Sequence, residues 1–127
     1  MSKSYERKLL ADWEDVFRQG ILTFWVFLAL AENRLSVPEI KREVERLSKG
    51  TYSAAEQTLY RLLRKQYDLE LVDYKEVASA NGPMKKIYSL SPLGNRLLGE
   101  FTRKNISLFH QKEIIKIIAK EPQDETK

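Results

Sequence analysis

The segment SAAEQTLYRLLRKQ, residues 53–66, carries side chains that can hydrogen-bond to phosphates and to base edges. At about 100° per residue, a helix over this segment gathers Ala55, Leu59, Leu62 and Leu63 on one side. The other side is polar and almost free of acid: Ser53, Gln57, Tyr60, Arg61 and Arg64, flanked by Lys65. Arginine can donate to guanine and glutamine can read adenine, whereas serine and tyrosine bind phosphate oxygens. The same face could be an ordinary solvated surface, so the rest of the chain has to decide.

Other chemistry finds little support in the composition. The chain has no cysteine and one histidine, which excludes disulfides, thiolate metal sites and multi-histidine metal sites. We find no nucleophile beside a base, no glycine-rich phosphate loop and no metal-ligand spacing. The sequence therefore predicts no enzyme, no cofactor and no metal. His110 is interpreted as a surface or interface residue.

Charge and hydropathy allow a polyanionic partner. The net charge is +4 and the isoelectric point is near 9.3, but 22 bases against 18 acids is a mild excess. The apolar run GILTFWVFLALA, residues 20–31, is too short to span a bilayer. Acidic residues precede it, which is wrong for a signal peptide. We expect a helix buried nearly all round, in a cytoplasmic protein without a membrane partner.

Two helices joined by a short turn should present the basic face. Residues 4–17 predict an amphipathic N-terminal helix, and Gly20 is expected to interrupt it before the buried run. In SVPEIKREVERLSKG, Ser36 and the glutamate three residues later predict a capping box, and Gly50 should end this helix. Ser53 is expected to cap the next helix after the turn KGTYS. Such spacing is typical of a helix-turn-helix.

A hairpin should follow. The segments LELVDYKEVA and KKIYSLS are rich in valine, tyrosine and isoleucine and enclose Asn81-Gly82, which favours a tight turn with positive φ. Lys85 and Lys86 follow the turn at once. A hairpin carrying two lysines directly after a helix-turn-helix predicts a wing, whose lysines would bind the flanking DNA backbone or the minor groove. Ser36 and Lys41 are candidates for additional backbone contacts.

The C-terminal region predicts one long helix. Ser91 should cap it, Pro92 should occupy its first position, and it should run to about Lys120, some 45 Å. The expected organisation is an N-terminal helix over residues 1–19, a winged-helix domain over 20–91, a C-terminal helix over 92–120 and a disordered polar tail over 121–127. The fold class is mainly α, within α+β: a winged helix-turn-helix with an extra helix at each end.

Three segments resemble the PadR family of transcriptional regulators: GILTFWVFLALAE, TLYRLLRK at 58–65 and GPMKKIYSLSPLGNRLL at 82–98. Together they cover roughly residues 18–103. The specific part is the combination of TLY with the later GP, YSL and Gly94. The chain departs from the family pattern at Glu70, where a glycine is usual, at Gln66, where leucine is common, and at Arg61, where proline is common.

The resemblance implies a dimeric repressor whose recognition helix is 53–65 and whose wing is 79–87. It places the dimer surface on residues 5–17 and 93–118, with the candidates Leu9, Trp13, Phe17, Leu97, Phe101, Leu108, Ile115 and Ile118. The implied partners are a palindromic double-stranded operator, a second copy of the chain and a small hydrophobic effector. Trp13 and Phe101 either line an effector pocket or belong only to the interface. The alternative function is a winged-helix module that binds another protein instead of DNA.

Overall fold

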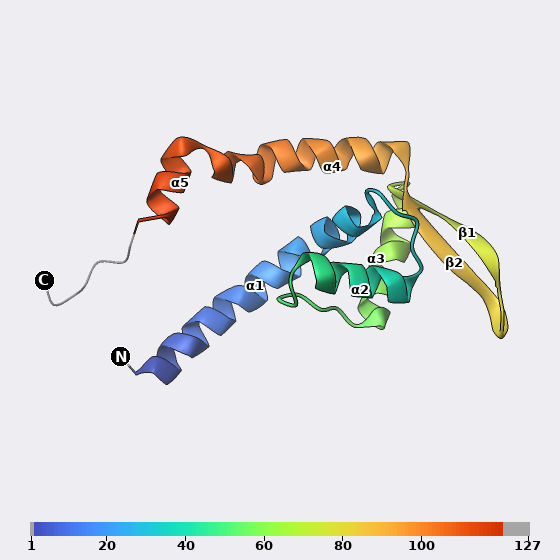
Figure 1. Cartoon of the computed structure of the whole chain (residues 1–127), viewed down its shortest axis with the longest axis horizontal. Helices are drawn as coiled ribbons and strands as arrows, with labels where there is room; N and C mark the ends of the chain where they lie inside the picture. The colour runs from blue at the N-terminus through green and yellow to red at the C-terminus, as the bar shows by residue number, and fades with distance from the viewer. Residues whose placement is uncertain (1, 121–127) are drawn as a thin grey trace, which may run out of the picture. The chain divides into compact units, whose positions relative to one another are not determined.

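The computed structural model describes residues 2–120, which divide between Asn95 and Arg96 into two compact units (Figure 1). The described helices are α1 (Lys3–Leu30), α2 (Val37–Leu47), α3 (Glu56–Asp68), α4 (Pro92–Asn105) and α5 (Lys112–Ile118), with a 3-10 turn at Ser107–His110. Strands β1 (Val72–Ser79) and β2 (Gly82–Leu90) form one antiparallel sheet. The predicted fold class, a mainly helical winged helix-turn-helix, is confirmed. The tail predicted over 121–127 lies outside the described residues.

The core of the first unit joins α1, α2, α3 and the base of the hairpin. Val26, Ile40, Leu59, Leu63 and Val72 are completely or almost completely buried. Residues 21–30 are all buried or half-buried, as predicted for the apolar run. No helix within residues 2–120 is long and apolar enough to cross a bilayer.

The predicted break at Gly20 is wrong, because α1 runs without interruption from Lys3 to Leu30. Glycine costs a helix interior only about 1 kcal/mol relative to alanine and, unlike proline, blocks no hydrogen bond. Burial of the segment that follows Gly20 outweighs that cost. In Figure 1 the N-terminal half of α1 extends beyond α2 and α3.

The two capping predictions had opposite outcomes. Ser36 and Glu39 form the predicted capping box, in which the Glu39 carboxylate accepts the Ser36 N–H at 2.9 Å. The predicted Ser53 cap is wrong, because α3 begins at Glu56 with Ala55 as its N-cap. The Ser53 hydroxyl is engaged elsewhere, in a hydrogen bond to the side chain of Glu45 on α2.

Glu70 ends α3 in the left-handed conformation, with φ of 64°. The Leu71 N–H donates to the Gln66 carbonyl at 2.9 Å, and the Glu70 N–H donates to the Tyr67 carbonyl at 2.9 Å. These two bonds make a Schellman motif, whose left-handed position is usually glycine. The departure from the family pattern at Glu70 therefore falls where a side chain is strained.

The predicted hairpin is present, but its tip lies one residue earlier than expected. Ser79 pairs with Gly82, so Ala80 and Asn81 form the turn, and the register shifts between Val77 and Ser79. Neither Asn81 nor Gly82 adopts positive φ. The bulge next to the turn increases the local twist, so a left-handed residue is not needed.

Residues after α4 do not continue as one long helix, so that prediction is wrong. The start is as expected, since the Ser91 hydroxyl accepts the Gly94 N–H at 2.9 Å and Pro92 opens the helix. Helix α4 then ends at Asn105, and Gln111 is extended before α5. Asparagine, isoleucine and serine in succession at 105–107 have low helix propensity, which favours a break there.

Candidate nucleic-acid interface

The polar face predicted for α3 is on the surface. Leu59 and Leu63 are fully buried against the core. The exposed residues of the opposite side are Gln57, Tyr60, Arg61, Arg64 and Lys65. The amphipathic pattern therefore places the base-rich side chains where a polyanion can reach them.

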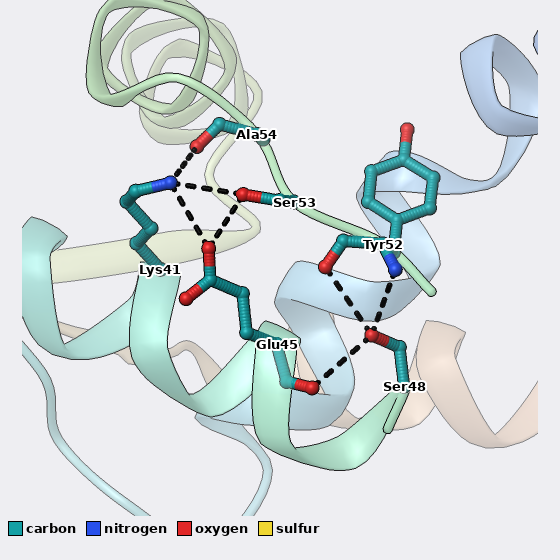
Figure 2. A network of polar contacts seen from close by, with 6 residues as sticks. All are labelled: Lys41, Glu45, Ser48, Tyr52, Ser53 and Ala54. Atoms are coloured by element: carbon teal, nitrogen blue, oxygen red, sulfur yellow. Dashed lines mark hydrogen bonds and ion pairs between the residues drawn. The ribbon is translucent and has the colours of Figure 1, made fainter. Parts of the chain in front are cut away.

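Lys41 and Ser53 take part in a network of polar contacts between α2 and the turn before α3 (Figure 2). The Lys41 ammonium donates to the Glu45 carboxylate at 3.1 Å, to the Ser53 hydroxyl at 3.0 Å and to the Ala54 carbonyl at 3.1 Å. The hydrogen bond from Ser53, then that from Lys41, holds the pKa of Glu45 below its ordinary 4.5. An ammonium has three N–H donors, and Lys41 uses all three in these hydrogen bonds. Two of the bonds, to Ser53 and Ala54, attach the turn before α3 to α2.

Ser48 and Tyr52 complete the attachment of this turn. The Ser48 hydroxyl accepts the Tyr52 N–H at 3.0 Å and donates to the Tyr52 carbonyl at 3.2 Å (Figure 2). The Tyr52 hydroxyl donates to the carbonyl of Arg18 on α1. Sequence reasoning missed both residues. The one sequence signal is Tyr52 itself, an aromatic residue in the otherwise polar turn KGTYS, which indicates a buried contact.

Ser36 is buried, and its hydroxyl donates to the Glu39 carboxylate at 2.9 Å. The backbone and side-chain hydrogen bonds from Ser36 lower the pKa of Glu39, and the charges of Lys85 and Arg42 act in the same direction. Ser36 therefore stabilises the start of α2. For the predicted contact to DNA, its buried hydroxyl would first have to become exposed.

The wing lysines are exposed, as predicted. Lys85 and Lys86 lie opposite Val77 and Glu76 in the sheet. A groove of about 610 Å³ runs between the start of α2 and the wing, and its cations are Arg42, Lys85 and Lys86. Arg42 is exposed and was not predicted, since its place on α2 gives no sequence signal for a groove formed with the wing.

A second hollow lies between α3 and the wing. It is lined by Tyr60, Leu63, Arg64, Tyr67, Asp68, Tyr74, Lys86 and Tyr88, and we call it the tyrosine cleft. The Tyr74 ring lies 4.9 Å from that of Tyr67 and 5.7 Å from that of Tyr88. The Lys86 ammonium is 4.6 Å from the centre of the Tyr74 ring.

The predicted dimer residues are apolar and mostly exposed within their own units. On α1, Trp13 is 75% exposed and Phe17 60%, and Leu9 is exposed with them. In the C-terminal region Leu97, Phe101, Ile115 and Ile118 are exposed, whereas Leu108 is half-buried. Residues 2–120 hold no cluster of acids and histidine suited to a metal ion.

Comparisons with known proteins agree with this geometry. Residues 26–100 match the model of the "Transcriptional regulator PadR-like family", whereas a search of curated proteins found no match. A PadR-like transcription factor from Bacteroides fragilis is 28% identical, with a TM-score of 0.64 over 85% of this chain and 99% of that one.

Two further solved structures share the fold. A PadR family regulator from Eggerthella lenta has a TM-score of 0.72 at 18% identity, covering 94% of this chain and 100% of that one. PadR from Bacillus subtilis, solved in complex with operator DNA, has a TM-score of 0.59 at 20% identity, covering 84% and 52%. Since the family model spans more than half of the sequence, the chain belongs to the PadR-like family of transcriptional regulators.

Proposed function

We propose that this regulator is a dimeric repressor that binds a palindromic operator in double-stranded DNA. The observation that carries the proposal is the exposed, base-rich face of α3 in the same unit as the two wing lysines. Gln57 and Arg61, in the first two turns of α3, read base edges in the major groove. The flanking side chains bind phosphates and set the register without reading sequence: Tyr60, Arg64, Lys65, Lys85 and Lys86.

A relative supports the DNA partner. Bacillus subtilis PadR was solved with operator DNA, and its chain shares this fold. In our proposal, Lys41 and Ser53 serve the same function indirectly. They hold the turn that orients α3, instead of contacting the duplex themselves.

Dimerisation follows from the limited charge of one copy. Arg61, Arg64, Lys65, Lys85 and Lys86 give five cationic contacts, which makes binding by a single copy weak and sensitive to salt. Two copies with recognition helices about 34 Å apart would bind both halves of a palindrome. The exposed apolar side of α1 around Trp13, together with the apolar residues of the C-terminal region, supplies the surface for the second copy.

A small apolar effector completes the proposal. Trp13 and Phe101 offer aromatic surface, and an effector would act by favouring one spacing of the two recognition helices. Titration of apolar compounds, followed by tryptophan fluorescence and by DNA affinity, tests this part. No response to a broad panel would remove the effector from the proposal and leave DNA binding untouched.

Mobility shift against the promoter upstream of the regulator's own gene, with a salt series, tests DNA binding. We expect Arg61→Ala to weaken discrimination between sequences and Lys86→Ala to weaken all DNA about equally. Arg46→Ala, which also removes one exposed positive charge on α2, serves as the control for net charge. If neither Arg61→Ala nor Lys86→Ala differs from this control, the contact surface is wrong. The rival protein-binding module would then be favoured.

A further inference from the structure

The tyrosine cleft brings together cationic and hydroxyl side chains from elements that are separate in the sequence. Its cavity measures about 330 Å³, and its walls come from α3, β1 and β2. Two cations face it from different elements, Arg64 from the helix and Lys86 from the wing. Four tyrosines line it as well, Tyr60, Tyr67, Tyr74 and Tyr88.

Tyr88 lines the cleft together with Tyr60, Tyr74 and Arg64. Burial raises the pKa of Tyr88, the neighbouring Tyr60 and Tyr74 raise it further, and Arg64 lowers it. Tyr60, Tyr74 and Arg64 are therefore all close enough to Tyr88 to affect its charge. A phenol hydroxyl can donate a hydrogen bond.

Lys86 is held in position by Tyr74. Its ammonium lies over the Tyr74 ring at 4.6 Å, in the range of a cation–π interaction. The packing of Tyr74 between Tyr67 and Tyr88 fixes that ring in turn. This contact restricts the conformations of the long Lys86 side chain and keeps its ammonium beside the cleft.

The cleft is lined by hydroxyl, guanidinium and ammonium groups, which are hydrogen-bond donors. Such a set favours a negatively charged ligand with several acceptor lone pairs. A phosphate group fits this donor set, because its oxygens accept from guanidinium, ammonium and hydroxyl groups together. The acid in the lining is Asp68, one helical turn beyond Arg64. Its negative charge opposes the binding of an anion.

We propose that the tyrosine cleft seats one backbone phosphate of the duplex, bound by Arg64, the hydroxyls of Tyr60 and Tyr74, and Lys86. This inference rests on the proposed DNA-binding function and deepens it. A single phosphate contacted by both α3 and the wing would fix the angle between the helix in the major groove and the hairpin beside it. Tyr74 thereby becomes a DNA contact as well as the residue that positions Lys86.

Tyr74→Phe is the decisive variant, because it keeps the ring that packs on Tyr67, Tyr88 and Lys86 and removes only the hydroxyl. Using a duplex enriched from a random library by the wild-type protein, we expect Kd to rise about fivefold for the hydrogen bond lost at each half-site, or about 25-fold for the dimer. Ser89→Ala removes a hydroxyl from β2 at a position that does not line the cleft, and should leave Kd unchanged. Asp68→Asn should lower Kd, because it removes a negative charge from the cleft.

Neutral methylphosphonate linkages, placed one at a time along the same duplex, identify the phosphate. At one position in each half-site the substitution should weaken the wild type and have no further effect on Tyr74→Phe. If the wild type binds the duplex but no position couples to Tyr74→Phe, the cleft does not hold a backbone phosphate, although the protein still binds DNA. Failure to enrich any duplex would contradict the proposed function itself.

A titration with inorganic phosphate at constant ionic strength separates the two sources of this group. We expect no effect on DNA affinity beyond that of chloride. If phosphate competes with DNA for the wild type but not for Tyr74→Phe, and no methylphosphonate position couples, then the cleft takes free phosphate. That result would overturn its assignment to the duplex.

Discussion

The Tyr52 hydroxyl donates a hydrogen bond to the carbonyl oxygen of Arg18, which joins the turn before α3 to the middle of α1. Arg18 lies where α1 passes from its exposed half to its buried half. One continuous helix thus carries both the proposed dimer surface and the attachment point of the recognition helix. In a dimer formed through α1, this contact would help to set the distance between the two recognition helices.

Tyr52→Phe tests the attachment. Burial raises the pKa of Tyr52, so its hydroxyl stays protonated as a donor, and its loss should cost about 1 kcal/mol of unfolding free energy. Urea denaturation measures the change. Tyr67→Phe, which removes a hydroxyl from a tyrosine that is 45% exposed, should be close to neutral. Equal effects of the two variants would show that the bond to Arg18 does not stabilise the fold.

Glu70→Gly should stabilise the protein by about 1 kcal/mol. Glu70 occupies the left-handed position of the Schellman motif, where a Cβ atom is strained and glycine is not. Glu70→Ala removes the carboxylate but keeps the Cβ, and is expected to leave stability nearly unchanged. Chemical denaturation of the three proteins decides between strain and charge. An alanine variant as stable as the glycine variant would assign the gain to charge.

Gly94→Ala should have the opposite sign. A Cβ at position 94 would lie 2.1 Å from the Leu71 carbonyl oxygen, which also accepts the Ser91 N–H at 3.0 Å. The backbone would have to move, and overpacking of this kind costs about 1–3 kcal/mol. At Gly99 on the same helix a Cβ would make only an ordinary van der Waals contact, 3.7 Å from an Arg103 guanidinium nitrogen, so Gly99→Ala should be stabilising or neutral. Thermal unfolding of both variants makes the comparison; a stable Gly94→Ala protein would mean that α4 shifts freely at Leu71.

Acid should weaken the turn before α3. Hydrogen bonds from Ser53 and Lys41 lower the pKa of Glu45 in the folded state below its ordinary 4.5. A lowered folded pKa means that the stabilisation is complete above pH 4.5 and is lost as the pH falls through the folded pKa. Denaturation at several pH values should therefore show a constant advantage of wild type over Glu45→Gln above pH 4.5 and a shrinking one below it. An advantage that persists in acid would exclude the carboxylate as its source.

Local signals in the sequence predicted the parts of the fold that local interactions decide. Ser36 and Glu39 are three residues apart and cap α2 without help from elsewhere, and the apolar stripe of α3 follows from helical periodicity alone. Ser53 carried the same kind of signal and misled, because Lys41 and Glu45 on α2 bind its hydroxyl across the turn. Capping and tertiary contact compete for one side chain, and only the packed structure shows which prevails.

The candidate site divides in the same way. Gln57 and Arg61 could be identified from one helix, since their exposure follows from the burial of Leu59 and Leu63. Tyr74 could not, because its closeness to Tyr88 depends on the strand register and its closeness to Tyr67 on how the hairpin packs against α3. The tyrosine cleft therefore depends on contacts between α3, β1 and β2, which the sequence of one element alone does not predict.

Trp13→Glu tests the proposed dimer. Trp13 is 75% exposed on α1 among other exposed apolar side chains, and a buried charge at the centre of an interface should abolish association. We expect the wild type to sediment at about twice 14.9 kDa and the variant as a monomer, with DNA affinity lower by at least about 30-fold. Gln19→Glu, which adds one negative charge at an exposed position of the same helix outside residues 5–17, controls for charge alone. A dimeric Trp13→Glu protein would move the interface away from α1 and leave the C-terminal region to hold the two copies together.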